Sequence, residues 1–214
     1  MADRRSRSVS SRKQPQQARS NELVAAILDA AVQVLAKEGA QRFTTARVAE
    51  RAGVSVGSLY QYFPNKAAIL FRLQSDEWRS TSELLRGILA DPTKPPPARL
   101  RALVHPFIRS ECEEAAIRSA LSDAAPLYRD APEAQEARAA GEGIVAIFMR
   151  EALPEAPEAS RELAGELIKT TLSEIGKRFS ETSRSEAEIV RHADGLADMF
   201  CAYLEELARR GDHS

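Results

Sequence analysis

Hydrophobic positions in this chain recur at the three- and four-residue spacing of amphipathic helices, not in the alternation typical of strands. The first stripe follows Ser20, a residue that can cap a helix N-terminus. Gly39 comes after it, where a helix commonly ends in a left-handed residue. We therefore expect an all-α protein whose first helix starts after Ser20. The stripe consists of Val24, Ile27, Leu28, Ala31 and Leu35.

Two short helices are predicted next, each with its own start and stop residues. Thr44 or Thr45 can cap "ARVAERA", and Gly53 ends that helix. Ser55 can cap "VGSLYQYF", and Pro64 ends that helix because proline disfavours helical backbone in the residue before it. The pattern predicts two short helices joined by a tight turn.

The rest of the chain is also expected to be helical. Asn65 can cap a long fourth helix, which ends before the proline-rich stretch 91–97. Several helices then lead to two strongly apolar ones at the end of the chain. The last begins with a capping box of Ser185 and Glu188. We divide the chain into a tail (1–19), a three-helix head (20–66) and a larger body (67–210).

Charge is distributed unevenly between these parts. Residues 1–66 carry eleven Lys and Arg against five Asp and Glu, whereas the remainder carries nineteen against twenty-six. A basic first third on an acidic body suggests that only the first part meets a polyanion. Residues 1–19 nearly lack apolar side chains, which predicts a flexible tail. Whether this tail is a solvated leader or a basic arm that contacts DNA stays open.

Composition and spacing give little sign of other chemistry. Cys112 and Cys201 are far apart in the sequence, and we expect free, packed thiols in a reducing cytoplasm. The basic N-terminus is not followed by an apolar segment, and no run of residues suits a membrane span. No metal-ligand spacing occurs. We expect no cofactor, no metal and no membrane partner.

The stretch 53–57, "GVSVG", has two interpretations. It fits the G-x-S-x-G turn of a serine hydrolase, in which a strand delivers the nucleophile, here Ser55, into a strained turn. It also fits the turn of a DNA-binding helix-turn-helix. The preceding segment is predicted to be helical, and the strand–helix alternation of a hydrolase is missing. The hydrolase interpretation therefore stays only as a minor alternative, and we do not expect an enzyme.

Under the DNA interpretation, Leu59 and Phe63 should anchor the third helix to the head core, one helical turn apart. The remaining side chains can face a major groove, where Gln61 can read adenine. Gly57 permits close approach to a phosphate, and Lys66 can bind one as a point charge. The candidate DNA-binding residues are Thr44, Thr45, Val56, Gly57, Ser58, Tyr60, Gln61, Tyr62 and Lys66.

Residues 44–70, "TTARVAERAGVSVGSLYQYFPNKAAIL", closely resemble the DNA-binding segment of TetR-family transcriptional regulators. A capping Thr, AGVS, G-x-x-Y-x-Y-F and a Lys three residues after the Phe coincide in register. The match is good over residues 20–75, and beyond them only the helical architecture agrees. The resemblance implies that the third helix reads a palindromic operator on double-stranded DNA, as part of a cytoplasmic, nucleoid-associated repressor.

A palindromic operator asks for a two-fold dimer, and the two terminal helices are the candidates for its interface. The named interface residues are Phe179, Leu196, Phe200, Tyr203 and Leu204; an intramolecular core is the alternative. The resemblance also implies a pocket in the body for a small apolar inducer. Candidate pocket residues, each of which could equally be plain core, are Trp78, His105, Phe107, Ile108, Tyr128, Phe148 and Met149. A DNA-binding module without any small ligand remains an alternative.

Overall fold

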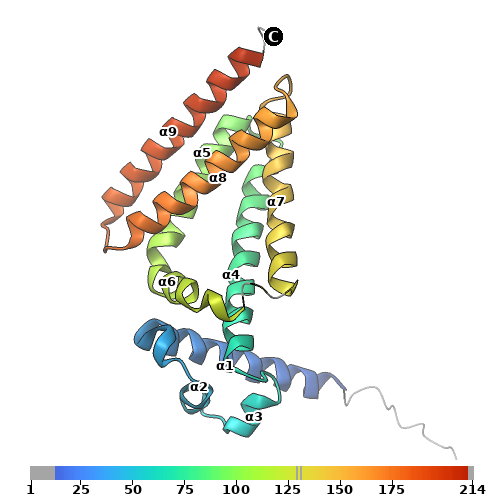
Figure 1. Cartoon of the computed structure of the whole chain (residues 1–214), viewed down its shortest axis with the longest axis vertical. Coiled ribbons are helices and arrows are strands. Elements are labelled where there is room, and N and C mark those ends of the chain that lie inside the picture. The colour runs from blue at the N-terminus through green and yellow to red at the C-terminus, as the bar shows by residue number, and fades with distance from the viewer. Residues whose placement is uncertain (1–12, 129, 131, 212–214) are drawn as a thin grey trace, which may run out of the picture. The chain divides into compact units, whose positions relative to one another are not determined.

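The computed structural model describes the backbone of residues 13–128, 130 and 132–211, with side chains except at 13–18 and 133–142. Over these residues every regular element is helical, as the periodicity predicts (Figure 1). A 3₁₀ turn, Ala125–Leu127, precedes α7. The helices are α1 (Lys13–Arg42), α2 (Thr45–Ala52), α3 (Val56–Tyr60), α4 (Lys66–Leu89), α5 (Pro96–Glu113), α6 (Ala115–Ala124), α7 (Pro132–Ala152), α8 (Glu158–Ser180) and α9 (Glu186–Gly211).

The chain forms two compact units, Met1–Leu73 and Gln74–Ser214. From here on, head and body mean these two units, which divide the chain after Leu73 and not after residue 66. In the head, α2 packs against both α1 and α3. The two anchors predicted from the sequence are buried there: Leu59 is fully buried and Phe63 is nearly so, and Phe43 is also fully buried in the head. The other buried hydrophobic residues of the head are Ile27, Ala30, Ala31, Val34, Leu35, Val48, Ala49, Ile69, Leu70 and Leu73.

Hydrogen bonds at the helix ends fix the short elements of the head. The Thr44 side chain accepts from the Arg47 backbone N–H at 3.3 Å, and Ser55 accepts from the Ser58 N–H at 3.0 Å. Gly53 ends α2 in the left-handed region (φ 69°, ψ 27°), and its N–H donates to carbonyls of the last turn of that helix. These caps match the starts and stops predicted for α2 and α3.

Two predicted boundaries in the head are wrong. The first helix begins at Lys13, not after Ser20, so part of the predicted tail is helical; residues 1–12 lie outside the described residues. Ser20 does not cap a helix but donates a side-chain hydrogen bond to the Tyr62 hydroxyl at 3.1 Å. The third helix ends at Tyr60 and not at Phe63, because the backbone beyond it tightens: the Tyr62 and Phe63 N–H groups both donate to the Leu59 carbonyl.

In the body, α5 is the central helix and packs against α6, α7, α8 and α9 (Figure 1). It begins at Pro96, inside the proline-rich stretch 91–97, because proline is tolerated in the first turn of a helix, and it continues through Pro106. Its buried face carries Leu100, Leu103, Val104, Phe107 and Ile108 into a core shared with α7, α8 and α9. The start of α9 has the predicted capping box, in which the Ser185 N–H donates to Glu188 Oε2 at 2.9 Å and the Glu188 N–H to Ser185 Oγ.

Two ion pairs and one histidine–carboxylate contact join one face of α5 to α9. Arg101 pairs with Asp198, His105 Nε2 lies 3.0 Å from Asp194 Oδ1, and Arg109 pairs with Glu186. The α5 positions are four residues apart, so they lie on one side of the helix. The pairs are exposed, so they add little stability individually and serve mainly to set the register of the two helices.

Two glycines bring α8 close to its neighbours. A Cβ atom at Gly165 would lie 3.1 Å from Val145 Cγ1 on α7, and one at Gly176 would lie 3.0 Å from Glu111 Cγ on α5. A Cβ at either position would require the neighbouring side chains to move by a few tenths of an ångström. α8 thus lies close to α7 at Gly165 and close to α5 at Gly176.

A charged cluster joins α4, α5 and α6 within the body. Arg118 of α6 lies 2.7 Å from carboxylate oxygens of both Glu77 and Glu111, and 2.9 Å from Glu114. Glu111 is buried, and its burial raises the pKa of this carboxyl above 4.5, although Arg118 acts in the opposite direction. One guanidinium thus faces three carboxylates, which leaves the cluster negatively charged when all are ionised.

We expect Gly53→Ala to destabilise the head by about 1–2 kcal/mol, because an L-residue is strained at φ 69°. The added Cβ would touch nothing within 4 Å, so the whole cost is conformational. Gly57→Ala is the matched control: it lies in a helix with open space around it and should leave stability unchanged or slightly higher. Urea unfolding followed by circular dichroism measures the stability of both variants. Equal stabilities would contradict the requirement for glycine in the left-handed backbone at position 53.

We expect the stability of Glu111→Gln relative to the parent to rise between pH 4 and pH 7. A carboxyl whose pKa is raised on folding binds more protons in the folded state, so its contribution to stability is lost as pH rises through the folded pKa. Glutamine does not titrate and removes that loss. Urea unfolding at several pH values measures the difference, with Glu113→Gln on the exposed side of α5 as the control. A pH-independent difference would refute the raised pKa.

Candidate nucleic-acid interface and ligand cavity

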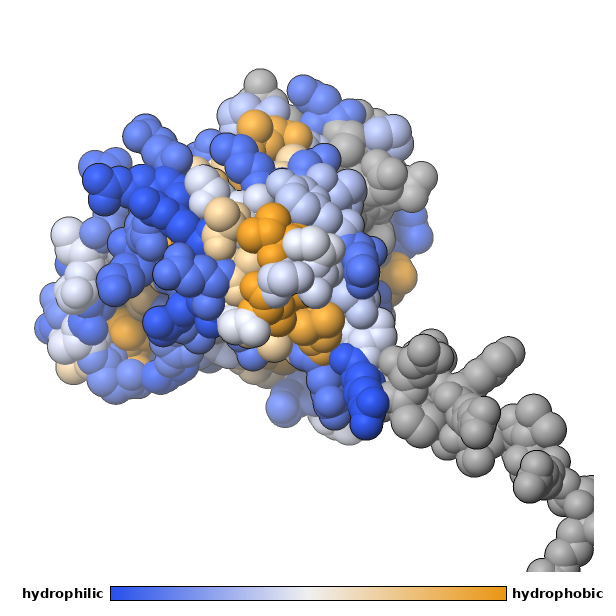
Figure 2. All heavy atoms as spheres, turned by 90° about the horizontal axis from the view of Figure 1, so that it is seen from below, coloured by the Kyte–Doolittle hydropathy of each residue, from blue (hydrophilic) through white to orange (hydrophobic). Residues whose placement is uncertain are grey.

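The helix pair α2 and α3 presents one buried and one exposed side. On α3 only Leu59 is buried, whereas Val56 is 40% exposed and Tyr60 is 49% exposed. These two side chains are four residues apart, so they lie on the same outer side of α3 and leave it open to solvent. Figure 2 shows the molecule from below relative to Figure 1, with hydrophobic areas among mostly hydrophilic residues.

Hydrogen bonds hold several of the predicted contact residues in place. The Thr45 and Tyr60 hydroxyls lie 3.2 Å apart and link α2 to α3. The Ser58 hydroxyl lies 2.8 Å from that of Ser55. Tyr62 differs from the other predicted residues because it is half-buried and its hydroxyl is bonded to Ser20 of α1. Tyr62 therefore joins α1 to the segment after α3, and it is less accessible to a nucleic acid than the exposed candidates.

The remaining predicted contact residues are exposed. Thr44, Gln61 and Lys66 are solvent-accessible, and Asn65 caps α4 beside Lys66 by accepting from the Ala68 N–H at 2.9 Å. A Cβ atom at Gly57 would meet only Ser55 Oγ, at 3.8 Å. The fold itself therefore does not require glycine at this position, and the surface there is open to a close approach by another molecule.

Ser55 has a structural role that accounts for its place in the G-x-S-x-G stretch. Its hydroxyl caps α3, and it follows a helix and a turn, not a strand. The only hydroxyl partner recorded for it among the described residues is Ser58. The geometry lacks the strand-to-helix turn and the neighbouring base that a nucleophilic serine needs.

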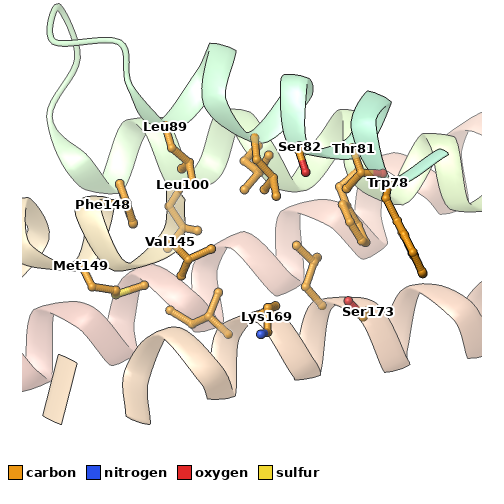
Figure 3. A pocket seen from close by; sticks show the side chains of 15 residues that line it. Trp78, Thr81, Ser82, Leu89, Leu100, Val145, Phe148, Met149, Lys169 and Ser173 are labelled. Atoms are coloured by element: carbon orange, nitrogen blue, oxygen red, sulfur yellow. The ribbon is translucent and has the colours of Figure 1, made fainter. Parts of the chain in front are cut away.

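The body contains a cavity of about 330 Å³ between α4, α5, α7 and α8, which we call the apolar cavity (Figure 3). Its volume lies at the lower end of the range of about 300–1,000 Å³ for small-molecule sites. The walls are mostly aliphatic and aromatic. They are formed by Trp78, Thr81, Ser82, Leu85, Leu89, Leu100, Leu103, Phe107, Val145, Phe148, Met149, Ile168, Lys169, Leu172 and Ser173.

Of the seven predicted pocket residues, four line this cavity: Trp78, Phe107, Phe148 and Met149. The other three do not. His105 points to α9, where it pairs with Asp194. Ile108 is fully buried in the core, and Tyr128 is buried with its hydroxyl donating to the Leu121 carbonyl at 2.8 Å.

Sequence reasoning missed the polar part of the cavity wall. Thr81 and Ser82 on α4, and Lys169 and Ser173 on α8, all line it. Ser173 is four residues after Lys169, so helical spacing alone could have placed both on one face. Their position next to a cavity depends on how four helices meet, which no local pattern records.

Arg99 contacts two residues of the cavity wall, Leu89 and Phe148, and was also missed. It is 4% exposed, donates to the Leu89 carbonyl at 2.5 Å and pairs with Glu151 at 2.6 Å. Its guanidinium lies 5.5 Å from the centre of the Phe148 ring, within cation–π range. Arg99 therefore ties the last residue of α4 to α7 beside a cavity-lining side chain.

The predicted dimer-interface residues need correction. Leu196, Phe200 and Leu204 of α9 are buried in the core of this one chain, so they cannot form a surface. Phe179 and Tyr203 pack against that core and are half-buried; the Phe179 ring stacks on His192 with centroids 3.9 Å apart. Burial of that imidazole, with the nearby Arg184 charge, lowers the pKa of His192. Other apolar side chains are open instead: Leu163 and Leu167 on α8 and Met199 on α9.

Two further properties of the described residues bear on function. Among residues 13–128, 130 and 132–211, no cluster of three or more His, Cys, Asp or Glu side chains has metal-binding geometry. No helix within this part of the chain has the length and hydropathy needed to cross a membrane.

Comparison with known sequences matches both units. Residues 27–73 match the model of bacterial regulatory proteins of the TetR family, and residues 95–207 match the tetracyclin repressor-like C-terminal domain. The HTH-type transcriptional repressor KstR of Mycolicibacterium smegmatis is 33% identical over 125 residues, 58% of this chain and 60% of its own length. The fatty acid metabolism regulator protein of Bacillus subtilis is 45% identical over 47 residues, 22% of this chain and 24% of its own length. The match thus spans less than two thirds of each of these relatives.

Solved structures share the fold. The fatty acid degradation regulator FadR from Bacillus halodurans has a TM-score of 0.65 at 19% identity, covering 83% of this chain and 94% of that one. A TetR-family regulator from Mesorhizobium loti has a TM-score of 0.66 at 17% identity, covering 86% and 98%. The family models cover the helix-turn-helix head and most of the body. The chain therefore belongs to the TetR family of bacterial transcriptional regulators, which are not enzymes.

Proposed function

We propose that this protein is a homodimeric repressor that binds a palindromic DNA operator through α2 and α3 and is released by a small, largely apolar ligand. The observation that carries this proposal is the exposed face of α3, which is held rigidly by a buried Leu59 and two capped helix ends. A helix of this kind, preceded by a second helix and a tight turn, fits a major groove. Such a regulator would act in the cytoplasm, on the nucleoid.

Chemistry on this face supports DNA contact. Thr44 and Tyr60 offer hydroxyls to phosphates, Gln61 offers an amide to a base edge, and Lys66 offers a charge. The open space at Gly57 supports a close backbone approach. The KstR relative carries the name of a repressor, which favours repression over activation here as well.

The apolar cavity supports ligand control. The alternative, a DNA-binding module without a small ligand, would be favoured by a filled body, whereas this body holds about 330 Å³ of mostly apolar space. A ligand that binds one arrangement of the dimer better than the other would shift the balance between them. A coupling of about 1–3 kcal/mol would change operator affinity by roughly 5–150-fold.

The surface formed by Leu163, Leu167 and Met199 is our proposed dimer contact, in place of the buried residues of α9. Each of these three side chains is about half exposed on the two last helices. Two copies of such a helix pair can form a four-helix bundle, and two-fold symmetry makes the contact self-complementary.

Selection of bound duplexes from a random DNA pool tests the proposal directly. It should recover a palindrome whose half-sites are separated by about one helical turn, roughly 34 Å. Recovery of no consensus sequence at low salt would refute DNA reading by this protein.

We expect Lys66→Ala to weaken binding of the selected operator by about tenfold, since a charged phosphate contact is lost. The slope of log affinity against log salt should also fall by about one. Fluorescence anisotropy over a salt series measures both. Lys94→Ala, at an exposed site in the body, is the control and should change neither quantity. An unchanged slope for Lys66→Ala would remove this lysine from the interface.

We expect Leu167→Glu to convert the dimer into a monomer at micromolar concentration. Two-fold symmetry brings two new carboxylates near each other in a desolvated contact, which costs several kcal/mol. Analytical ultracentrifugation measures the mass. Ile147→Glu on α7, an apolar position that is more exposed than Leu167, should leave the dimer intact. A dimer that survives Leu167→Glu, or dissociates equally with both variants, would exclude this surface.

A further inference from the structure

The wall of the apolar cavity is polarised along its length. In Figure 3, Leu89, Phe148 and Met149 lie at one end, while Trp78 and the hydroxyl-bearing residues lie at the other. The hydroxyls belong to Thr81 and Ser82 of α4 and to Ser173 of α8. A molecule that fills this space therefore needs an apolar body at one end and hydrogen-bonding capacity at the other.

Lys169 is the one charged side chain among the fifteen that line the cavity, and it lies between these two ends (Figure 3). Two arginines of the body are paired with carboxylates: Arg99 with Glu151, and Arg161 with Glu158. Lys169 has no ion-pair partner within 4 Å among the described side chains. Its ammonium is thus available to a charge that enters from outside the protein.

A second hollow adjoins the cavity, and we call it the polar cleft. The two share Trp78, Thr81, Phe107 and Ser173. The cleft is lined by five carboxylates and three basic side chains, an excess of two negative charges; these are Glu77, Glu111, Glu113, Glu174 and Glu181, with Arg118, Lys177 and Arg184. An acidic cleft of this kind repels a large head group that carries several negative charges.

We propose that the ligand of the apolar cavity is a molecule with an extended apolar body and a single carboxylate, and that Lys169 binds this carboxylate. The apolar body occupies the end formed by Leu89, Phe148 and Met149. The carboxylate accepts a hydrogen bond from the Lys169 ammonium and from the Ser173 hydroxyl one turn further along α8. The acidic polar cleft selects against derivatives of the same molecule that carry several negative charges. This inference rests on the proposed ligand control of the cavity.

Three ten-carbon probes that differ only in their head group test the proposal: decanoate, decanol and decylammonium. Isothermal titration calorimetry with the full-length protein measures each affinity, and the fluorescence of Trp78, the single tryptophan, reports occupancy of the cavity. We expect decanoate to bind about fivefold more tightly than decanol, the upper range for an ion pair with an exposed lysine. Decylammonium should bind most weakly.

Lys169→Met keeps the apolar stem and removes the charge. It should abolish the preference for decanoate while the affinity for decanol stays the same, and Lys169→Arg should restore the preference. Lys177→Met, two turns further along α8 and on the polar cleft, is the matched control and should keep it. Persistence of the preference in Lys169→Met would mean that this lysine only covers the wall with its stem. Tighter binding of decylammonium, or no binding of any probe, would also overturn the proposal.

Release of the operator, measured separately by fluorescence anisotropy, distinguishes the proposed carboxylate ligand from the proposed ligand control of DNA binding. If decanoate binds through Lys169 but leaves operator affinity unchanged, the ligand assignment stands and ligand control of DNA binding fails. If decanol or decylammonium releases the operator and decanoate does not, ligand control stands and the carboxylate assignment fails.

Discussion

Burial of Leu59 is the contact on which α3, part of our proposed DNA-binding surface, depends. A helix of five residues such as α3 has no stability of its own in water, because nucleation costs more than so few hydrogen bonds return. The helix exists because Leu59 is fully buried, Ser55 caps its start and Gly53 turns the chain before it. Packing on one side leaves the other side rigid yet uncovered, which is the condition for reading a groove.

The body differs from the head because its helices must pack stably around the apolar cavity, which no side chain fills. Its core is continuous along α5, and the ion pairs between α5 and α9 lie on the far side of α5 from the cavity walls of α4 and α7. Arg99 joins the end of α4 to α7 through Leu89 and Glu151. The helices around the cavity are therefore held at their ends and by α5, and the cavity walls need not meet in the middle.

Local signals along the chain predicted most helix boundaries correctly. Capping side chains such as Thr44, Asn65 and Ser185 act within three residues of their partners, so the sequence alone identifies them. Ser20 failed as a start signal because its hydroxyl is used in a contact with Tyr62, far away in the sequence. Such competition between local and distant partners is invisible to a pattern read along one helix.

The proposed dimer surface and the cavity also depend on contacts between distant residues, which a local sequence pattern does not reveal. A wide apolar stripe on α9 predicts that one face is buried, but not whether its partner belongs to the same chain or a second copy. Phe200 and Leu204 proved to be internal, and the less apolar outer face holds Met199. Likewise, Phe148 and Ile108 are both apolar residues that the sequence analysis named as pocket candidates, but only Phe148 lines the cavity. These outcomes depend on the relative placement of several helices.

The two close-approach glycines of α8 have a consequence for how this cavity can change over evolution. Gly165 is held against α7 and Gly176 against α5, and the lining residues Ile168, Lys169, Leu172 and Ser173 lie between them. The close contacts of α8 with its neighbours lie at these two glycines, so the cavity-lining side chains between them can be exchanged without changing those contacts. Replacements at these lining positions alter the volume or polarity of the cavity, whereas a larger residue at Gly165 or Gly176 would first require the neighbouring side chains of α7 or α5 to move. A lineage could thus acquire a new effector by changing a few of these lining positions while retaining the glycines.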